Sequence, residues 1–409
     1  VCKVKHHYRL VTGFTPATKV AEFYDSNNGH TWITIADLKG KVVTDSTNKI
    51  SDYYLREYHQ EKVKKGSLLY SFKLSVGQVA FAGKDLYTNE AIAAFQNTTK
   101  VNLPFFFYAA PLFIIHNSNI NIYGAHILNQ DLIKNAYTVF PPLSEQQAIA
   151  NYLDKKTAEI DKIIAEREKK IELLNELKSS IISRAVTKGI NPHAKMKDSG
   201  IDWIGEIPNH WQIRKSTLVF NNFGSGTTAK AGDKRYRENG DIPWLNTGDL
   251  NDGLIQRIPN KVNHLAIETY PALKIYPEGS LVVAMYGATI GKLGILTTPC
   301  CTNQACCVIL PTKHANMYYY KYVFMTMTDN LIIHSNGGGQ PNISQDIIRN
   351  SKLPYPPIKE QKSIAEYLDK KSNELDSAIA TIKEECILYK EYKQSLISEV
   401  VTGKRKVVD

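Results

Sequence analysis

Two stretches of the chain carry apolar residues at the spacing of one helical face. The series of positions seven apart are Leu153, Ile160, Arg167, Leu174 and Ile181 in the first stretch and Leu368, Leu375, Ile382, Tyr389 and Leu396 in the second. A second stripe follows each series four residues later, and charged residues fill the other faces. This pattern predicts two long amphipathic helices. A narrow apolar stripe on a long helix needs a partner, so we expect the two helices to pair antiparallel as a coiled coil.

No proline or glycine interrupts residues 144–187. A helix over that stretch would be about 65 Å long. Ser144 and Gln147 resemble a capping box at its start, whereas the second stretch has Lys359 at the matching position. Capping therefore supports the start of the first helix only.

The starts of the two helices have nearly the same sequence. PPLSEQQAIANYLDKK begins at Pro141 and PPIKEQKSIAEYLDKK begins at Pro356, and 11 of the 16 aligned residues are identical. Shorter matches run through the preceding segments, pairing TWITIADL (31–38) with PWLNTGDL (243–250). Two copies are too few for a solenoid. The repeat therefore predicts two similar halves related by a pseudo-twofold axis.

Each half begins with a mixed region, here called a head, in which short alternating strands are separated by turns. KKGSLLYSFKLSVGQVAFAG (64–83) and PEGSLVVAMYGATIGKLGILTT (277–298) are each typical of two strands joined by a glycine-containing turn. YYYKYVFM (318–325) indicates a helix packed on the sheet. The sequence thus predicts an α+β protein with an internal repeat. The expected divisions are a first head at 1–140, a first helix at 141–189, a linker with the second head at 190–355, and a second helix with the C-terminal tail at 356–409.

The composition favours a folded protein with a polyanionic partner. Of 409 residues 43% are hydrophobic, and 50 lysines and arginines against 40 acidic residues give a net charge of +10. Such an excess suits nucleic acid. The opening VCKVKHHYRL has no apolar signal core, and LPFFFYAAPLFII (103–115) is too short for the roughly 18 apolar residues of a membrane span. We therefore expect a cytoplasmic protein with no membrane partner.

No catalytic motif is complete in the sequence. GATIGKL (287–293) is one residue shorter than a phosphate-binding loop and has Leu293 where serine or threonine would bind magnesium. CCTNQACC (300–307) resembles a zinc site, but adjacent cysteines on a strand point to opposite faces. The aligned positions in the first copy are apolar: Leu86, Tyr87, Ile92 and Ala93. We expect no catalytic residues and no metal ligands, with the cysteines buried as small apolar side chains.

Several motifs together carry a resemblance to a known family. They are the two helix starts at 141–156 and 356–371, MKDSGIDWIGEIPNHW (196–211), IPWLNTGDL (242–250), GATIGKLG (287–294) and GQPNIS (339–344). With them the chain resembles the DNA-specificity subunit (HsdS) of type I restriction–modification systems over nearly its whole length. The first head lacks a segment like WIGEIPNHW, so we expect the natural chain to begin before Val1.

The resemblance implies a non-catalytic subunit of a larger complex. In this family each head is a target-recognition domain that reads one half of a bipartite, asymmetric site in double-stranded DNA, and the paired helices set the gap. Two methyltransferase subunits dock on the helices, bind S-adenosylmethionine and modify adenine N6. Restriction subunits use ATP and Mg²⁺. The resemblance implies no cofactor on this chain itself.

Asparagine, glutamine, arginine and lysine match base edges in the major groove. The candidate base readers are Lys73, Gln78 and His126 in the first head and Asn246, Lys292, Gln340 and Asn342 in the second. A basic loop at 221–237 holds one acid, Asp233, beside Tyr236 and suits phosphate contacts. Its basic residues are Lys230, Lys234, Arg235 and Arg237. For helix pairing and partner docking, the candidates besides the heptad positions are Glu145, Gln146, Tyr152, Glu360, Gln361 and Tyr367.

Two other functions stay open at this point. The chain could be a coiled-coil adaptor that binds only proteins, and charge reversal in the basic loop would then leave DNA binding unchanged. It could instead be the recognition half of a fused DNA methyltransferase or nuclease. That second function needs a cofactor or metal motif, and the duplication leaves no unassigned segment to hold one.

Overall fold

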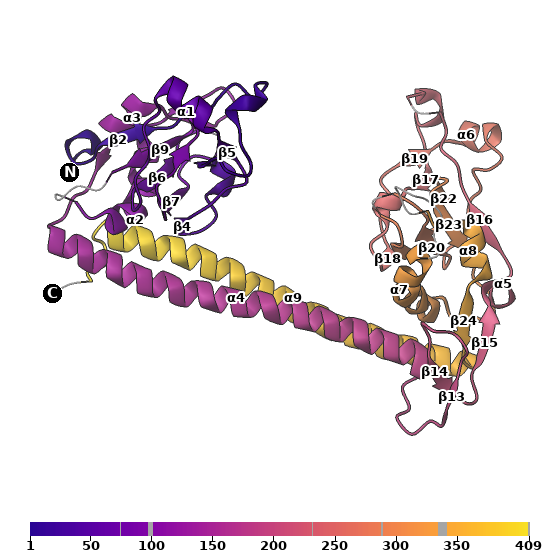
Figure 1. Ribbon diagram of the computed structural model, residues 1–409. Coiled ribbons are helices and arrows are strands. Elements are labelled where there is room, and N and C mark those ends of the chain that lie inside the picture. The colour runs from indigo at the N-terminus through magenta and orange to yellow at the C-terminus, as the bar shows by residue number, and fades with distance from the viewer. Residues whose placement is uncertain (74, 97–100, 231, 288, 334–341, 408–409) are drawn as a thin grey trace. The chain divides into compact units, whose positions relative to one another are not determined.

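The computed structural model describes residues 1–409 except 74, 97–100, 231, 288, 334–341 and 408–409. The chain forms two compact units, Val1–Arg167 with Glu384–Asp409, and Glu168–Lys383. Each unit holds one head and one end of both long helices (Figure 1). The boundary between the two units falls in the middle of both long helices. It does not test the predicted boundaries between heads and helices, which stay a prediction.

The first head is built on a five-stranded and a three-stranded sheet. In sheet order, the larger one consists of β2 (Leu10–Thr12), β9 (Ile92–Phe95), β6 (Leu68–Ser71), β7 (Val79–Ala82) and β4 (Val42–Val43). The smaller one consists of β5 (Lys49–Ile50), β3 (His30–Ile33) and β8 (Tyr87–Thr88). Every residue of β6 and β9 is buried. These two strands therefore form the centre of the head.

Helix α2 (Leu103–Ile114) covers one face of the larger sheet, between the strands and the long helices (Figure 1). Asn102 caps the helix and Pro104 stands in its first turn, where a missing amide hydrogen costs nothing. The Phe106 ring meets the Phe95 ring edge-on at 5.0 Å and stacks on Tyr8 at 4.2 Å. This aromatic cluster holds the sheet to the helix.

The second head repeats the first strand for strand. Its larger sheet has the order β16 (Phe223–Ser225), β23 (Cys306–Ile309), β20 (Leu281–Ala284), β21 (Leu293–Leu296) and β18 (Leu254–Ile255). The smaller sheet consists of β19 (Lys261–Val262), β17 (Ile242–Leu245) and β22 (Cys301–Thr302). Helix α7 (Met317–Ile333) takes the place of α2, with Tyr320 against Phe220 at 4.9 Å. The predicted α+β fold with an internal repeat is confirmed.

The chain enters and leaves each head on neighbouring antiparallel strands. β1 (Cys2–Lys3) pairs with β12 (Tyr137–Thr138), and β15 (Gln212–Lys215) pairs with β24 (Lys352–Tyr355). A hairpin of β13 (Met196–Asp198) and β14 (Glu206–Pro208) precedes β15. The remaining helices are α1 (Asp52–Tyr58), α3 (Gln130–Asn135), α5 (Ser216–Val219), α6 (His264–Thr269) and α8 (Gln345–Asn350), and a second hairpin joins β10 (Asn119–Ile120) to β11 (His126–Ile127).

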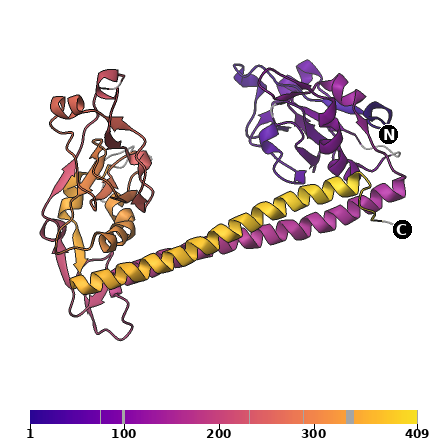
Figure 2. The same cartoon turned by 180° about the vertical axis from the view of Figure 1, so that it is seen from behind.

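The long helices α4 (Leu143–Lys188) and α9 (Ile358–Val401) run side by side in both views (Figures 1 and 2). In the first unit Lys393 Nζ lies 2.7 Å from the Asp161 carboxylate. In the second unit Lys178 Nζ lies 2.7 Å from Asp376. Each residue of one pair stands 215 positions from its counterpart in the other pair, and the pairing is antiparallel. The predicted antiparallel coiled coil is therefore confirmed, although α4 begins one residue before the expected cap, Ser144.

Cys301, Cys306 and Cys307 lie in strands of the second head, Cys300 directly precedes β22, and all four are buried. Burial raises the pKa of Cys300 and Cys307 to about 12 and that of Cys301 to about 11. Since the thiolate is the reactive and metal-binding form, these thiols are inert. They pack as apolar side chains.

We expect only Cys2 to react quickly with a thiol reagent at pH 8 in the native chain, because it is half-buried while the other five cysteines are buried. Timed alkylation followed by mass spectrometry measures this. Cys2→Ser should remove the fast phase, and denaturant should expose the remaining thiols. Fast labelling of the 300–307 cluster in the native chain would contradict this assignment.

Candidate nucleic-acid interface and head–helix junctions

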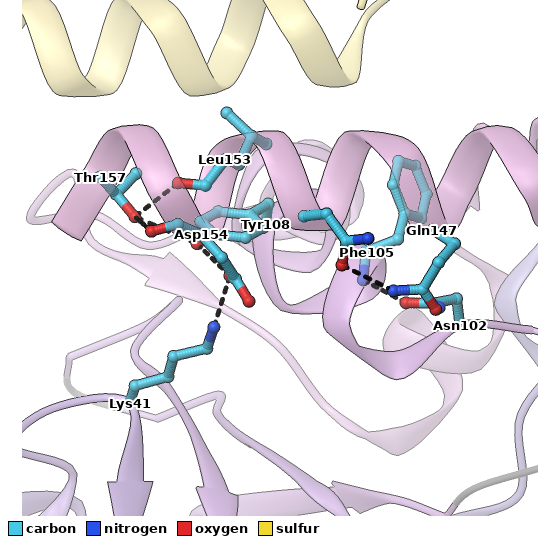
Figure 3. Close-up of polar contacts among 9 residues, drawn as sticks. Lys41, Asn102, Phe105, Tyr108, Gln147, Leu153, Asp154 and Thr157 are labelled. Atoms are coloured by element: carbon cyan, nitrogen blue, oxygen red, sulfur yellow. Dashed lines mark hydrogen bonds and ion pairs between the residues drawn. The ribbon is translucent and has the colours of Figure 1, made fainter. Parts of the chain in front are cut away.

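A buried glutamine fastens the first head to the start of α4. Gln146 is 2% exposed. Its Oε1 accepts a hydrogen bond from the Asn102 amide at 3.0 Å, and its Nε2 donates to the Pro141 carbonyl at 2.8 Å. Asn102 in turn caps α2 by accepting from the Phe105 amide at 2.9 Å and donates to Gln147 (Figure 3). The head helix and the long helix thus share one hydrogen-bonded corner.

The second head has the same corner. Gln361 is fully buried, accepts from the Asn316 amide at 2.8 Å and donates to the Pro356 carbonyl at 2.9 Å. Asn316 caps α7 by accepting from Tyr319. We had placed Gln146 and Gln361 among the candidates for pairing and docking. Because both ends of each buried amide are bonded inside the chain, these glutamines join head to helix and present no surface to a partner.

A second junction lies two turns further along each helix. The Tyr108 hydroxyl of α2 donates to Asp154 at 2.7 Å and lies 3.2 Å from the Thr157 hydroxyl, while Lys41 forms an ion pair with Asp154 (Figure 3). Thr157 also donates to the Leu153 carbonyl at 2.7 Å. Desolvation is the main cause that raises the pKa of Tyr108. The phenol therefore remains a donor to the carboxylate at every physiological pH.

The matching junction of the second head uses Asp369. The Tyr322 hydroxyl donates to it at 2.6 Å and Lys321 Nζ approaches at 3.3 Å. Burial likewise raises the pKa of Tyr322. Lys321 comes from α7 itself, whereas Lys41 comes from the loop before β4. In each head a lysine pairs with the equivalent aspartate, but the lysine comes from a different element in the two heads.

The other pairing and docking candidates separate by burial. The buried heptad residues are Leu153, Ile160, Leu368, Ile382 and Leu396, and those of intermediate exposure are Arg167, Leu174, Ile181, Leu375 and Tyr389. Glu145 and Tyr152 are half-buried, and Tyr367 is exposed. Glu360 forms an ion pair with His210 at 2.8 Å. Glu145, Tyr152 and Tyr367 thus remain as candidates with surface to offer.

The basic loop of the second head is organised around Asp233. This residue caps the short 3-10 helix Lys234–Tyr236, and its carboxylate accepts two hydrogen bonds from the Arg235 guanidinium, at 3.0 and 2.7 Å. Hydrogen bonding by Arg235 lowers the pKa of Asp233 to about 2. Arg237 lies over the Trp244 ring at 5.3 Å. Arg235 is therefore engaged within the loop, whereas the exposed Lys234 points its charge to solvent.

Lys230 belongs to the same loop, because its carbonyl accepts from the Asp233 amide at 3.2 Å and its own amide donates to the Tyr270 hydroxyl at 3.2 Å. The structure therefore brings the four basic candidates together. Lys292 is exposed in the turn before β21. Asn342 is also exposed and pairs with Tyr286, a residue that follows β20 in the chain. Gln340 lies outside the described residues.

Asn246 has a structural role that the base-reading prediction missed. It forms a capping box with Asp249 at the 3-10 helix Thr247–Asp249 and accepts from Asn303 at 3.3 Å. Thr34 and Asp37 form the same box in the first head. Because its side chain is used in this turn, Asn246 is a poor candidate for reading bases. The repeated spacing of the two boxes was visible in the sequence.

The three candidates of the first head make different contacts, although Lys73 and Gln78 both lie between β6 and β7. Lys73 lies 3.9 Å from Glu90. Gln78 lines a groove with α2, Thr157 and Lys393, at the long helices. His126 stands on the β10–β11 hairpin, 2.6 Å from the Ser118 hydroxyl. Only His126 and Lys73 therefore remain as surface candidates away from the helices.

Sequence reasoning named Gln146 and Gln361 but missed the residues of the second junction and the exposed tip of the β10–β11 hairpin. A signal existed for the junctions: Tyr108 and Tyr322 are 214 positions apart, and Asp154 and Asp369 are 215 apart inside the repeated YLDKK motif. Nothing in the sequence pattern indicated Lys41, because the second head has no lysine at the matching position.

The comparison with known families agrees with this geometry. The family described as the type I restriction modification DNA specificity domain matches residues 3–173 and 208–385. The chain therefore belongs to this family, and the two matched segments correspond to its two copies of head and helix.

Curated relatives have the same description. The MjaVIII type I restriction enzyme specificity subunit of Methanocaldococcus jannaschii is 28% identical over 299 residues, which cover 69% of this chain and 65% of the relative. The EcoBI type I restriction enzyme specificity subunit of Escherichia coli is 23% identical over 430 residues, covering 95% and 84%. The match to MjaX, a second M. jannaschii relative, covers 62% of that relative. The chain thus spans less than two thirds of the length of these two M. jannaschii relatives.

Solved structures show the same fold. A chain from a study of complex assembly and conformational transition in the type I R-M system superposes with a TM-score of 0.71 at 13% identity, covering 97% of both chains. The HsdS subunit from Thermoanaerobacter tengcongensis gives a TM-score of 0.53 at 14% identity over the same shares. At such low identity the likeness is one of fold.

Across the part of the chain that the structure describes, no helix is long and apolar enough to cross a membrane. Within the same residues, no group of three or more histidine, cysteine or acidic side chains could hold a metal ion.

We expect Gln146→Ala to destabilise the first unit by about 1–3 kcal/mol, because the buried Asn102 amide and Pro141 carbonyl lose their partner. Urea unfolding followed by circular dichroism measures the shift in midpoint. Gln394→Ala, at an exposed position of α9, is the matched control and should stay within about 0.5 kcal/mol of the parent. Equal effects of the two substitutions would contradict the junction.

In the basic loop, we expect Lys234→Gln to weaken binding to a random-sequence duplex and to lower the slope of log affinity against log salt by about one. Asp233→Asn should strengthen binding, because it removes a negative charge and releases Arg235. Fluorescence anisotropy at several salt concentrations measures both. Arg237→Lys keeps the charge and is the control for the slope. Identical slopes for all three variants would remove this loop from the interface.

Proposed function

We propose that this chain is the DNA-specificity subunit of a type I restriction–modification complex, in which each head reads one half of a bipartite site in double-stranded DNA. The chain contributes recognition, and the chemistry belongs to other subunits. In this proposal the continuous helices α4 and α9 set the gap between the half-sites.

One observation carries the proposal: the two heads share a scaffold but differ at matching surface positions. A β-carbon at Gly13 would clash with the Thr88 carbonyl, and a β-carbon at Gly226 would clash with the Thr302 carbonyl. The loops that follow the two glycines therefore start from equivalent positions in the two heads. Each loop contains a 3-10 helix, Ala21–Phe23 in the first head and Lys234–Tyr236 in the second. The first presents Glu22 where the second presents Arg235. Equal scaffolds with different surface charges suit two readers of different sequences.

The long helices support docking of two copies of one partner. Leu173 and Leu177 are exposed on α4 in the second unit, and Leu388 and Tyr392 are exposed on α9 in the first. The members of the two pairs are 215 positions apart. Residues four apart on a helix are neighbours, and contiguous exposed apolar side chains are the kind of patch that marks an interaction surface. A surface that occurs once in each unit suits a partner that is present twice, and we propose that this partner is the methyltransferase subunit.

The remaining parts of the complex follow from this assignment. We propose that S-adenosylmethionine binds to the methyltransferase subunits and that ATP and Mg²⁺ bind to restriction subunits. In this arrangement the chain acts without a cofactor. Its own residues hold the heads at fixed positions on the helices through Gln146, Gln361, Asp154 and Asp369, so that a base contact made by a head is tied to the docked partner.

Long-read sequencing of DNA from cells that express this chain with its methyltransferase subunit, in an otherwise unmethylated strain, tests the function. We expect N6-methyladenine in a motif of two parts separated by a fixed unspecified gap. Exchange of one head for that of another family member should change one half of the motif and leave the other half and the gap unchanged.

A complex that assembles but methylates no bipartite motif would overturn the proposal. A protein-binding coiled-coil adaptor would then be the better account, because the exposed helix surface would remain while sequence reading would not. Methylation by the chain without any partner would instead favour a fused methyltransferase.

A further inference from the structure

The β10–β11 hairpin of the first head exposes apolar side chains at its tip. Ile122 is 91% exposed and Tyr123 is 87% exposed. Ile120, in the strand leading to the tip, is also exposed. Many large apolar residues of the head are buried in its cores. Others are exposed, Val42 to 55% and Tyr53 to 54%, but Ile122 and Tyr123 are adjacent in the chain and each is more exposed than either. Two neighbouring apolar side chains with so much exposure need a reason.

The tip is a defined turn. The Asn121 side-chain oxygen accepts from the Tyr123 and Ala125 amides, both at 2.9 Å, and the Asn121 amide donates to the Ala125 carbonyl at 3.0 Å. Gly124 adopts φ +78°, which a larger residue rarely does. This network holds the turn so that Ile122 and Tyr123 stay at its end.

The hairpin has the size and charge of an element that enters a DNA groove. A two-stranded β-ribbon fits the major groove, which is about 12 Å wide. Residues 115–129 (IHNSNINIYGAHILN) contain no aspartate or glutamate, so the ribbon can pass between phosphates without repulsion. Asn119 and His126 are exposed on its strands. Apolar tips contact thymine methyl groups in the major groove.

The second copy differs at this place. Residues 119–127 (NINIYGAHI) align with 334–342 (HSNGGGQPN), so Ile122 and Tyr123 correspond to Gly337 and Gly338. A partner present twice would require similar apolar contact residues in both halves, as the exposed pairs on the long helices provide. An apolar pair that the sequence has in one copy and replaces by two glycines in the other suits an asymmetric ligand, as the proposed two-part DNA site is.

We propose that the β10–β11 hairpin enters the major groove of the first half-site and that Ile122 and Tyr123 at its tip contact base edges there. This inference rests on the proposed function and adds the reading element of the first head. The contact is apolar and independent of the phosphate charge. It therefore differs in kind from the contact made by the basic loop of the second head.

The test uses Ile122→Ser combined with Tyr123→Ser in the full chain with its methyltransferase subunits. Both side chains face solvent, so the double variant should fold as the parent does. We expect the motif found in the methylome to relax in the half that head exchange assigns to the first head, with the other half unchanged. Binding to a duplex carrying the parent motif should weaken about tenfold, in the range of one lost base contact.

Salt dependence separates this contact from phosphate binding. Because no charge is removed, the slope of log affinity against log salt should stay at the parent value, whereas Lys234→Gln lowers it. Ile122→Val with Tyr123→Phe should restore the parent motif. Val42→Ser, another exposed apolar position of the same head, is the control and should leave the motif unchanged.

Other outcomes are also decisive. An unchanged motif and affinity in the serine variant would overturn the inference. Loss of the methyltransferase subunit from the purified complex would overturn it too, because the tip would then dock a protein. A parent complex that methylates no bipartite motif would instead overturn the proposed function, a failure that shows before any hairpin variant is made.

Discussion

The structure depends on one buried contact made twice, the glutamine that joins the start of a long helix to the cap of a head helix, α2 in the first head and α7 in the second. An amide left unpaired in such a place costs about 1–3 kcal/mol. Gln146 and Gln361 avoid that cost only when the head helix and the long helix meet in one geometry. Asp154 and Asp369 add a second fixed point two turns further on. A head held at two points cannot turn freely against its helix.

This constraint separates what the two halves must share from what they can change. The glutamines, the carboxylates and the heptad positions maintain the frame, and they recur at an interval of 215 residues. Loops that extend from the frame differ in charge and shape, as Glu22 and Arg235 do. Such a division suits the proposed function, in which one kind of partner binds twice and an asymmetric ligand binds once.

Much of this could be predicted from the sequence. The heptad pattern predicted the two long helices, and the internal repeat predicted two heads of the same fold. Both predictions were possible because each signal extends over many residues. The burial of Gln146 and Gln361 could not be predicted, because a polar residue in a helix start looks the same whether it faces solvent or a backbone amide. Asn246 was assigned to base reading on its residue type alone, although the spacing to Asp249 was typical of a capping box. Contacts made by single residues across long stretches of chain leave no periodic signal.

The lysines at the second junction show that the geometry matters more than the sequence there. Lys41 reaches Asp154 from a loop and Lys321 reaches Asp369 from a helix, yet each carboxylate also accepts from a tyrosine hydroxyl. If the aspartate served only to keep the helix surface polar, the second head would not need Lys321 in the role that Lys41 has in the first head. Each carboxylate is still partly exposed, 39% for Asp154 and 42% for Asp369, yet a lysine pairs with it in both halves. The ion pair belongs to the junction between head and helix, and the lysine comes from a loop in the first head and from α7 in the second.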